Sequence, residues 1–224
     1  MRIVIKVGGS AIAPSLDARR FKAYADVLKS LVKDHTVLVV VGGGNPAREY
    51  INVSKELKAN NALRDLIGIG VSRLNARLLI SALSDVAYPE PPHDYSEANL
   101  AMYSGKMVIM GGVQPGQTTD AVAAILAEYV QADLLIRTTS VDGVFTADPR
   151  VDKNAKKLDS MTAKQLVEMV TKNEMHAGSN NIFDPLGAQI VMRSKIPMVV
   201  LNGNYPENIL TAVEGKPIGT IIKS

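Results

Sequence analysis

Short, almost wholly apolar runs that lead into glycine constrain the fold of this chain more than any other feature. Four such runs lie at 2–7, 36–41, 106–110 and 197–201. A strand with one exposed face alternates apolar and polar residues, whereas a parallel strand covered on both faces is apolar throughout. We therefore predict a mainly parallel sheet with both faces covered.

Helical patterns fill the segments between these runs and a fifth short run at 133–136. The segment 17–33 has an apolar stripe formed by Phe21, Tyr24, Ala25, Leu28, Leu31 and Val32. Further helices are expected at 61–83 and 119–130, and one that begins at Asp184-Pro185 and ends near 194. Strands that alternate with helices predict an α/β protein. The length of 224 residues suits one domain with two lobes.

Composition excludes several classes of function. A formal net charge of +3, with seven Tyr, three Phe and no Trp, argues against a nucleic-acid partner. The chain has no cysteine, and His35, His93 and His176 show no metal-ligand spacing. No apolar run approaches the roughly 18 residues of a membrane span, and the N-terminal segment lacks a signal-peptide pattern. We expect a cytoplasmic protein with no membrane partner and no protein-bound metal.

The loops that follow the strands carry the strongest functional signal. Double or triple glycine stands beside serine, asparagine or threonine at 8–10, 42–45 and 111–119, and Gly203 follows the last run. In a parallel sheet these loops share one edge, where ligands bind. Glycine there lets backbone amides approach phosphate oxygens. A strand-to-helix turn needs glycine anyway, but several such loops favour phosphates bound along one edge. The P-loop and dinucleotide fingerprints are absent.

Three segments together carry a family resemblance. The segment 5–10 (IKVGGS), the triple glycine with Arg48, and 138–148 (TTSVDGVFTAD) resemble the amino acid kinase family. Within that family, 111–120 (GGVQPGQTTD) is similar to the loop of archaeal UMP kinases. The resemblance extends to 218–222 and covers essentially the whole chain. It implies a three-layer α/β/α sandwich, with an acceptor lobe at about 1–130 and an ATP lobe at about 131–224.

The resemblance also implies a reaction, its substrates and an assembly. UMP kinases transfer the γ-phosphoryl group of ATP to UMP in pyrimidine nucleotide biosynthesis, with Mg²⁺ carried by the ATP phosphates. A homo-oligomer is implied as well, namely a hexamer built as a trimer of dimers. Close alternatives in the family phosphorylate carbamate, an acyl-amino acid or isopentenyl phosphate. A nucleotide sensor or storage protein on the same fold is a non-catalytic alternative.

Several residues match the ATP side of the family. Lys6 matches the lysine that bridges the transferring phosphoryl group, and a lysine inside an apolar strand needs a partner because burying an unpaired charge is costly. Asp120 matches the aspartate that orients active-site donors, although a carboxylate in the first turn of a helix is also favoured by the dipole. The resemblance thus implies that Lys6 and Asp120 are the catalytic residues. The positions that match ATP contacts are Gly9, Ser10, Gly44, Arg48, Thr139, Phe145 and Asp148.

The assignment of residues to UMP binding depends on the resemblance alone. Gly43 matches a contact to the UMP phosphate, and Asp65 matches the carboxylate that accepts from the ribose hydroxyls. By periodicity Asp65 is an ordinary polar helix residue. The loop that would close over uracil and the UMP phosphate contains Val113, Gln114, Pro115, Gly116, Gln117, Thr118 and Thr119. Its two threonines also have the character of helix caps.

One position departs from the bacterial members of the family. These carry a lysine beside the Val-Asp-Gly motif, where this chain has Ser140. A different group must therefore neutralise the leaving phosphate. An isopentenyl phosphate kinase would require a histidine by a glycine loop, and none stands near one along the sequence. The presence of Lys6 and of the loop 115–119 argues against a sensor without turnover.

Overall fold

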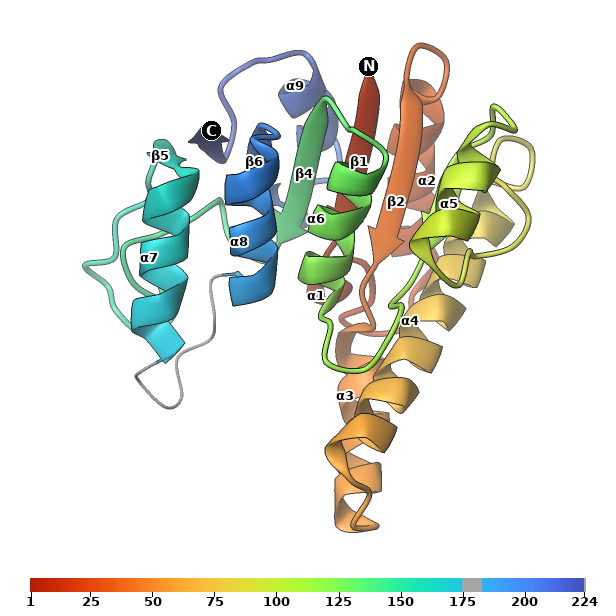
Figure 1. The fold of residues 1–224 in the computed structure, drawn as a ribbon, viewed down its shortest axis with the longest axis horizontal. Coiled ribbons are helices and arrows are strands. Elements are labelled where there is room, and N and C mark those ends of the chain that lie inside the picture. Colours follow the sequence, from red (N-terminus) through yellow and green to blue (C-terminus); the bar gives the residue numbers. More distant parts are fainter. Residues whose placement is uncertain (175–182, 224) are drawn as a thin grey trace.

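The computed structural model describes residues 1–174 and 183–223, which form an α/β/α sandwich around one sheet (Figure 1). The seven strands of the described part follow the order β3-β2-β1-β4-β6-β7-β5. They are β1 (Arg2–Val7), β2 (Thr36–Val41), β3 (Val108–Met110), β4 (Leu134–Thr139), β5 (Ser160–Thr162), β6 (Met198–Asn202) and β7 (Thr220–Lys223). The predicted fold class is confirmed.

Five neighbouring strands of the sheet, β3, β2, β1, β4 and β6, are parallel, as the continuous apolar runs predict. At the centre, Arg2 of β1 pairs with Thr36 of β2, and Ile3 pairs with Leu134 of β4. The carboxyl ends of these strands therefore share one edge of the sheet. The far side departs from parallel pairing, because β7 runs antiparallel to β6 and parallel to the short β5.

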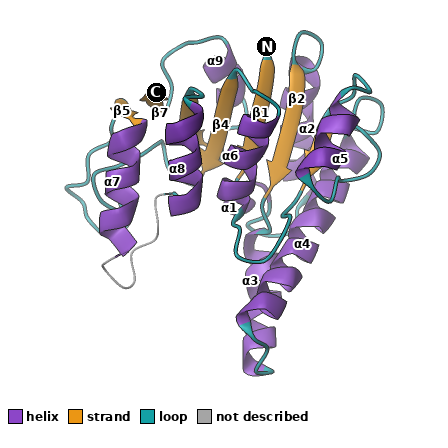
Figure 2. Ribbon diagram, in the orientation of Figure 1, coloured by secondary structure: helices purple, strands orange, loops and turns teal. Residues whose placement is uncertain are grey.

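Helices cover both faces of the sheet (Figure 2). In Figure 1, α5, α6, α7 and α8 lie in front of the strands, while α2 and α9 lie behind them. The helices are α1 (Gly9–Ile12), α2 (Ala18–Leu31), α3 (Gly44–Glu56), α4 (Asn61–Ala82), α5 (Tyr95–Met102), α6 (Thr119–Tyr129), α7 (Ala163–Glu174), α8 (Pro185–Ser194) and α9 (Asn208–Val213). The packed pair α3 and α4 projects beyond the carboxyl edge of the sheet.

Successive residues of the central strands belong to two apolar layers. Val4 and Val40 join the layer under α5, α6, α7 and α8. Ile3, Ile5 and Val39 join the layer under α1, α2, α4 and α9. Because neighbouring side chains of a strand point to opposite faces, a strand between two helical layers has to be apolar at nearly every position.

The helix caps explain where the predicted helices begin. The Asp17 side chain accepts from the amide of Arg19 ahead of α2, so this helix starts after the predicted residue 17. Asp184 caps α8 by accepting from the Gly187 amide at 2.7 Å, as predicted. Before α6 the cap is Thr118 alone.

Several predicted bounds are corrected by the structure. Thr119 is the first helical residue of α6 rather than a cap. The strand predicted at 106–110 begins at Val108. The run predicted at 133–136 is β4, which continues to Thr139 because Thr138 and Thr139 pair with Leu201 and Asn202 of β6.

Candidate active site

The glycine loops after β1 and β2 lie back to back at the carboxyl edge of the sheet. A Cβ atom on Gly9 would lie 2.1 Å from the amide nitrogen of Gly44, and one on Gly42 would lie 2.5 Å from the amide nitrogen of Gly9. Gly44 also has a positive φ of 68°, which residues with a side chain rarely adopt. These positions need glycine so that the two main chains can touch.

Polar side chains of α4 hold the glycine loops. The buried Asn75 amide donates to the carbonyl oxygens of Gly42 and Gly43, at 2.9 and 3.0 Å. The Ser72 hydroxyl accepts from the amide of Gly112 at 2.8 Å. Buried polar groups are satisfied in this way in most proteins. Sequence reasoning missed both residues; their polar character on the buried face of a long helix was the available signal.

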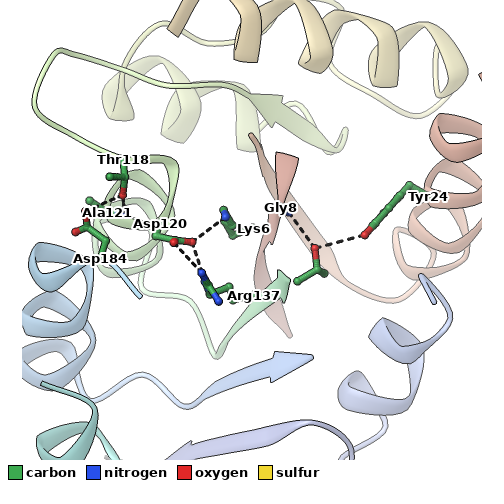
Figure 3. A network of polar contacts seen from close by, with 9 residues as sticks. Lys6, Gly8, Tyr24, Thr118, Asp120, Ala121, Arg137 and Asp184 are labelled. Carbon is green, nitrogen blue, oxygen red and sulfur yellow. Dashed lines mark hydrogen bonds and ion pairs between the residues drawn. The ribbon is translucent and has the colours of Figure 1, made fainter. Parts of the chain in front are cut away.

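A buried ion cluster lies beside these loops (Figure 3). The Lys6 ammonium of β1 lies 2.9 Å from Oδ1 of Asp120, in the first turn of α6. Arg137 of β4 donates from Nε to Oδ1 at 2.9 Å and from Nη2 to Oδ2 at 3.1 Å. The exposed fractions of the Lys6, Asp120 and Arg137 side chains are 10%, 13% and 11%. One carboxylate thus serves two cations, which leaves an excess of positive charge.

The cluster shifts the protonation of its members in opposite ways. Burial by itself raises the pKa of the Asp120 carboxyl, but the charges of Arg137 and Lys6 outweigh burial and hold this pKa well below its usual range. Burial lowers the pKa of the Lys6 ammonium; Asp120 opposes this effect and Arg137 adds to it. Bound phosphates would favour the charged form of Lys6, because opposite charges nearby stabilise it.

Arg137 is the site residue that sequence reasoning missed most clearly. The predicted strand ended at Ile136, whereas the register of β4 places Arg137 beside Lys6. A charge inside an apolar strand singled out Lys6, but Arg137 follows the predicted strand, so this signal did not apply to it. The guanidinium also lies over the Phe183 ring, 5.2 Å from the ring centroid, which favours a cation.

A cavity of about 260 Å³ is lined by the glycine loops and by both cations of the cluster. Thr138 also lines it and accepts from the Gly8 amide through its hydroxyl at 3.0 Å. Amides, hydroxyls and cationic side chains are the groups that bind phosphate oxygens. The predicted site residues that the structure brings together here are Lys6, Gly9, Ser10, Gly43, Gly44, Arg48, Thr119 and Thr139.

A second cavity, of about 80 Å³, shares Arg137 and Thr139 with the first. Phe145 and Asp148 line it too, so the three residues expected near adenosine lie together. Phe145 is half-buried and bridges to Lys157 through its backbone, and it belongs to neither apolar layer. An aromatic ring thus lines the cavity next to that of the glycine loops.

The loop expected to close over UMP lines neither cavity except at Thr119. The loop is instead tied to Asp65 of α4, whose Oδ2 accepts from the Gly116 amide at 2.9 Å. Asp65 and the loop are therefore neighbours, although 51 positions separate them in sequence. Two other hydrogen bonds join Tyr95 to Gln117 and Thr118 to Asp184, both at 2.8 Å.

A histidine does lie near a glycine loop, contrary to the expectation from the sequence. Arg73 of α4 donates from Nε to the Gly112 carbonyl at 3.0 Å, and its Nη1 lies 2.9 Å from Nδ1 of His93. His93 precedes α5 and is distant from the loop along the chain. Tertiary packing around α4 brings the two segments together.

Residues 1–202 match the Amino acid kinase family. The chain belongs to this family. A uridylate kinase from Methanocella arvoryzae is 75% identical over 223 residues, which cover 100% of both chains. A uridylate kinase from Methanococcoides burtonii is 52% identical over 220 residues, or 98% of this chain and 94% of the other. The family resemblance inferred from the segments 5–10 and 138–148 and from the triple glycine with Arg48 is therefore confirmed.

Solved structures agree with this family membership. The uridylate kinase of Archaeoglobus fulgidus has a TM-score of 0.91 and 44% identity, with 99% of this chain and 100% of the other covered. The UMP kinase of Bacillus anthracis has a TM-score of 0.82 at 24% identity, covering 99% and 95% of the two chains. At that identity the second likeness supports the fold alone.

Within 1–174 and 183–223, no three His, Cys, Asp or Glu side chains are grouped as a metal site would require. No helix in the same part of the chain is long and apolar enough to cross a membrane. His176, the third histidine, lies outside the described residues.

Proposed function

We infer that this chain transfers the γ-phosphoryl group of ATP to UMP, with UDP and ADP as products. The observation that carries this inference is the 75% identity, over the full length of both chains, to a protein named uridylate kinase. The reaction belongs to pyrimidine nucleotide biosynthesis. Carbamate, acyl-amino acid and isopentenyl phosphate kinases are not favoured, and neither is a sensor or storage protein.

The proposed mechanism is electrostatic. A UMP phosphate oxygen is already a nucleophile, so the reaction needs no general base. In phosphoryl transfer, catalysis consists mainly of positioning the groups and stabilising the charge that develops. Lys6 would bind the transferring phosphoryl group, and Asp120 would orient Lys6 by the contact of 2.9 Å. Arg48, which is exposed near the start of α3, would bind phosphate oxygens.

The binding residues are proposed from the two cavities and from the closing loop. ATP would contact Gly9, Ser10, Gly44, Arg48, Thr139, Phe145 and Asp148, all of which line one of the cavities. UMP would contact Gly43, Asp65 and the loop 113–119. The hydrogen bond from the Gly116 amide to Asp65 supports their assignment to one binding site.

The residues of the first cavity fit Mg²⁺ that arrives on the ATP phosphates. Its lining offers cations, amides and hydroxyls, which hold phosphate oxygens, and Mg²⁺ in kinases commonly binds the substrate phosphates with few protein ligands. When bound, Mg²⁺ would neutralise charge on those phosphates.

Three further features belong to the proposal. The acceptor and ATP lobes would divide near residue 130, and the protein would be cytoplasmic. A hexamer, built as a trimer of dimers, is the proposed assembly. Exposed apolar side chains on α3 and α4, and on the residue that follows α3, support burial of these helices between copies; they include Tyr50, Val53, Leu57, Leu63 and Leu66.

The proposed function is tested by measuring ADP release from Mg-ATP with several acceptors. UMP is expected to support the fastest turnover, ahead of CMP, dUMP, carbamate and isopentenyl phosphate. Turnover with carbamate or isopentenyl phosphate in place of UMP would assign the chain to another member of the family. Binding of nucleotides without any ADP release would indicate a sensor.

Asp65→Asn is expected to weaken UMP binding and to leave ATP binding nearly unchanged. The carboxylate would accept from the ribose hydroxyls of UMP, and it already accepts from the Gly116 amide at 2.9 Å. Loss of a charged hydrogen-bond partner costs about 1.5–3 kcal/mol, or about tenfold to a hundredfold in Kd. Titration calorimetry with each nucleotide separately measures the effect.

Asp26→Asn, which changes an exposed aspartate of α2, is the matched control. Because dUMP lacks one ribose hydroxyl, the preference for UMP over dUMP should also shrink in Asp65→Asn. Equal weakening of UMP and ATP binding would contradict the assignment of Asp65 to the acceptor.

A further inference from the structure

The proposed reaction develops negative charge at two places. The bond between the γ-phosphorus and the β-phosphate oxygen breaks, and its electron pair stays on ADP. A new bond forms between the γ-phosphorus and a UMP phosphate oxygen, with no proton required to move. Lys6 is one cation at this site. Ser140, which lines the second cavity, brings no charge.

Arg137 lies where the two cavities meet. It lines the cavity of the glycine loops together with Lys6, and it lines the neighbouring cavity together with Phe145. If the first cavity holds the phosphate chain and the second holds adenosine, the β-phosphate has to lie near their junction. Arg137 and Thr139 are the residues that both cavities share.

The Arg137 side chain is fixed but retains a free donor. Asp120 accepts from Nε and Nη2, at 2.9 and 3.1 Å. The Phe183 ring lies 5.2 Å from the guanidinium carbon. Within residues 1–174 and 183–223 no hydrogen bond is made by Nη1. A guanidinium held along one edge can offer its remaining donors to a phosphate without reorganising.

We propose that Arg137 binds the β-phosphate of ATP and stabilises the charge that ADP gains as the γ-phosphoryl group leaves. Arg137 is then the second cation of the transfer and supplies the charge that Ser140 lacks. Asp120 has a double task in this arrangement, because it fixes Lys6 toward the transferred group and Arg137 toward the leaving group. The proposal rests on the proposed function for its reaction, but the contact with the β-phosphate can be tested without turnover.

The first test compares the binding of ADP and AMP to Arg137→Met by titration calorimetry. A contact with the β-phosphate matters for ADP and not for AMP. The Kd for ADP is therefore expected to rise about tenfold to a hundredfold, the usual effect of losing a charge-assisted hydrogen bond. The Kd for AMP should stay within about twofold. Loss of a side chain that merely supports the fold would change the Kd for ADP and the Kd for AMP by the same factor.

The second test measures steady-state turnover. Arg137→Met is expected to lower kcat by about 10²-fold, as does the loss of one preorganised donor elsewhere. Arg137→Lys keeps the charge but not the planar guanidinium group, so its kcat should lie between those of the parent and of Arg137→Met. Arg193→Met is the matched control. Arg193 donates from Nε to Glu128 at 2.9 Å, and Glu128 lies on α6, the helix that also carries Asp120; Arg193 lines neither cavity.

A kcat within about threefold of the parent, or equal weakening of ADP and AMP, would overturn the proposal. If Arg137→Met fails to fold, the ratio of the ADP and AMP dissociation constants in Arg137→Lys decides the question, and an unchanged ratio counts against the contact. If the parent protein shows no turnover with UMP, the proposed function fails, while the comparison of ADP with AMP still tests Arg137.

Discussion

Lys6→Ala is expected to fold and to bind UMP almost normally, while its kcat falls by about 10²–10³-fold. The fold should survive because Asp120 keeps both hydrogen bonds from Arg137 after Lys6 is removed. The lost ammonium would act chiefly in the transition state, when charge spreads over the γ-phosphoryl oxygens. The Michaelis constants should then change only modestly. Steady-state kinetics and circular dichroism measure the two effects.

Lys29→Ala is a suitable control, since Lys29 forms an ion pair with Asp85 in which about half of each side chain is exposed. Surface pairs of this kind contribute about 0–1 kcal/mol, so its kcat should match that of the parent. A folded Lys6→Ala protein that turns over within a few-fold of the parent would remove Lys6 from the mechanism.

Asp120→Asn is expected to lower the free energy of unfolding by about 3–5 kcal/mol, the usual cost of removing one partner from a buried ion pair. The variant leaves Lys6 and Arg137 as two cations at paired positions of adjacent strands. Turnover should also collapse, because neither cation keeps its orientation. Urea unfolding measures the stability, and Glu128→Gln is the control on the same helix, in its more exposed pair with Arg193.

The double variant Asp120→Asn/Lys6→Met separates charge repulsion from catalysis. Removal of one cation should restore part of the stability lost in Asp120→Asn, whereas turnover should stay low. Additive losses of stability in the double variant would mean that Lys6 and Arg137 do not repel each other across Asp120.

The edge of the sheet that carries the candidate site could be predicted from the sequence, because parallel strands end together and glycine directly follows β1, β2, β3 and β6. The helix α3 could not, since Gly42 to Pro46 has the composition of a loop. Pro46 lies in the first turn of that helix, where no backbone donor is required. The antiparallel β7 and the three-residue β5 depend on pairing between distant segments.

In the candidate site, too, some residues could be found from the local sequence and others depend on long-range contacts. Lys6 is detectable as a charge in an apolar strand, and Asp120 through its helix start and the family resemblance. Arg137 depends on how far β4 continues, which β6 decides by pairing with Thr138 and Thr139. The approach of His93 to the loop at Gly112 depends on Arg73 of α4. Such long-range contacts leave no local pattern in the chain.

The contact between the two glycine loops has a kinetic consequence. Gly9 is assigned to the ATP side and Gly43 to the UMP side, and the backbone of Gly9 touches that of Gly44. Under these proposed assignments, the separation of the two bound nucleotides would be set by main chain, without a rotatable side-chain bond between them. Holding two reactants together makes a bimolecular step effectively unimolecular and can give very high effective molarities. Folding itself would thus establish much of this proximity, before either nucleotide binds.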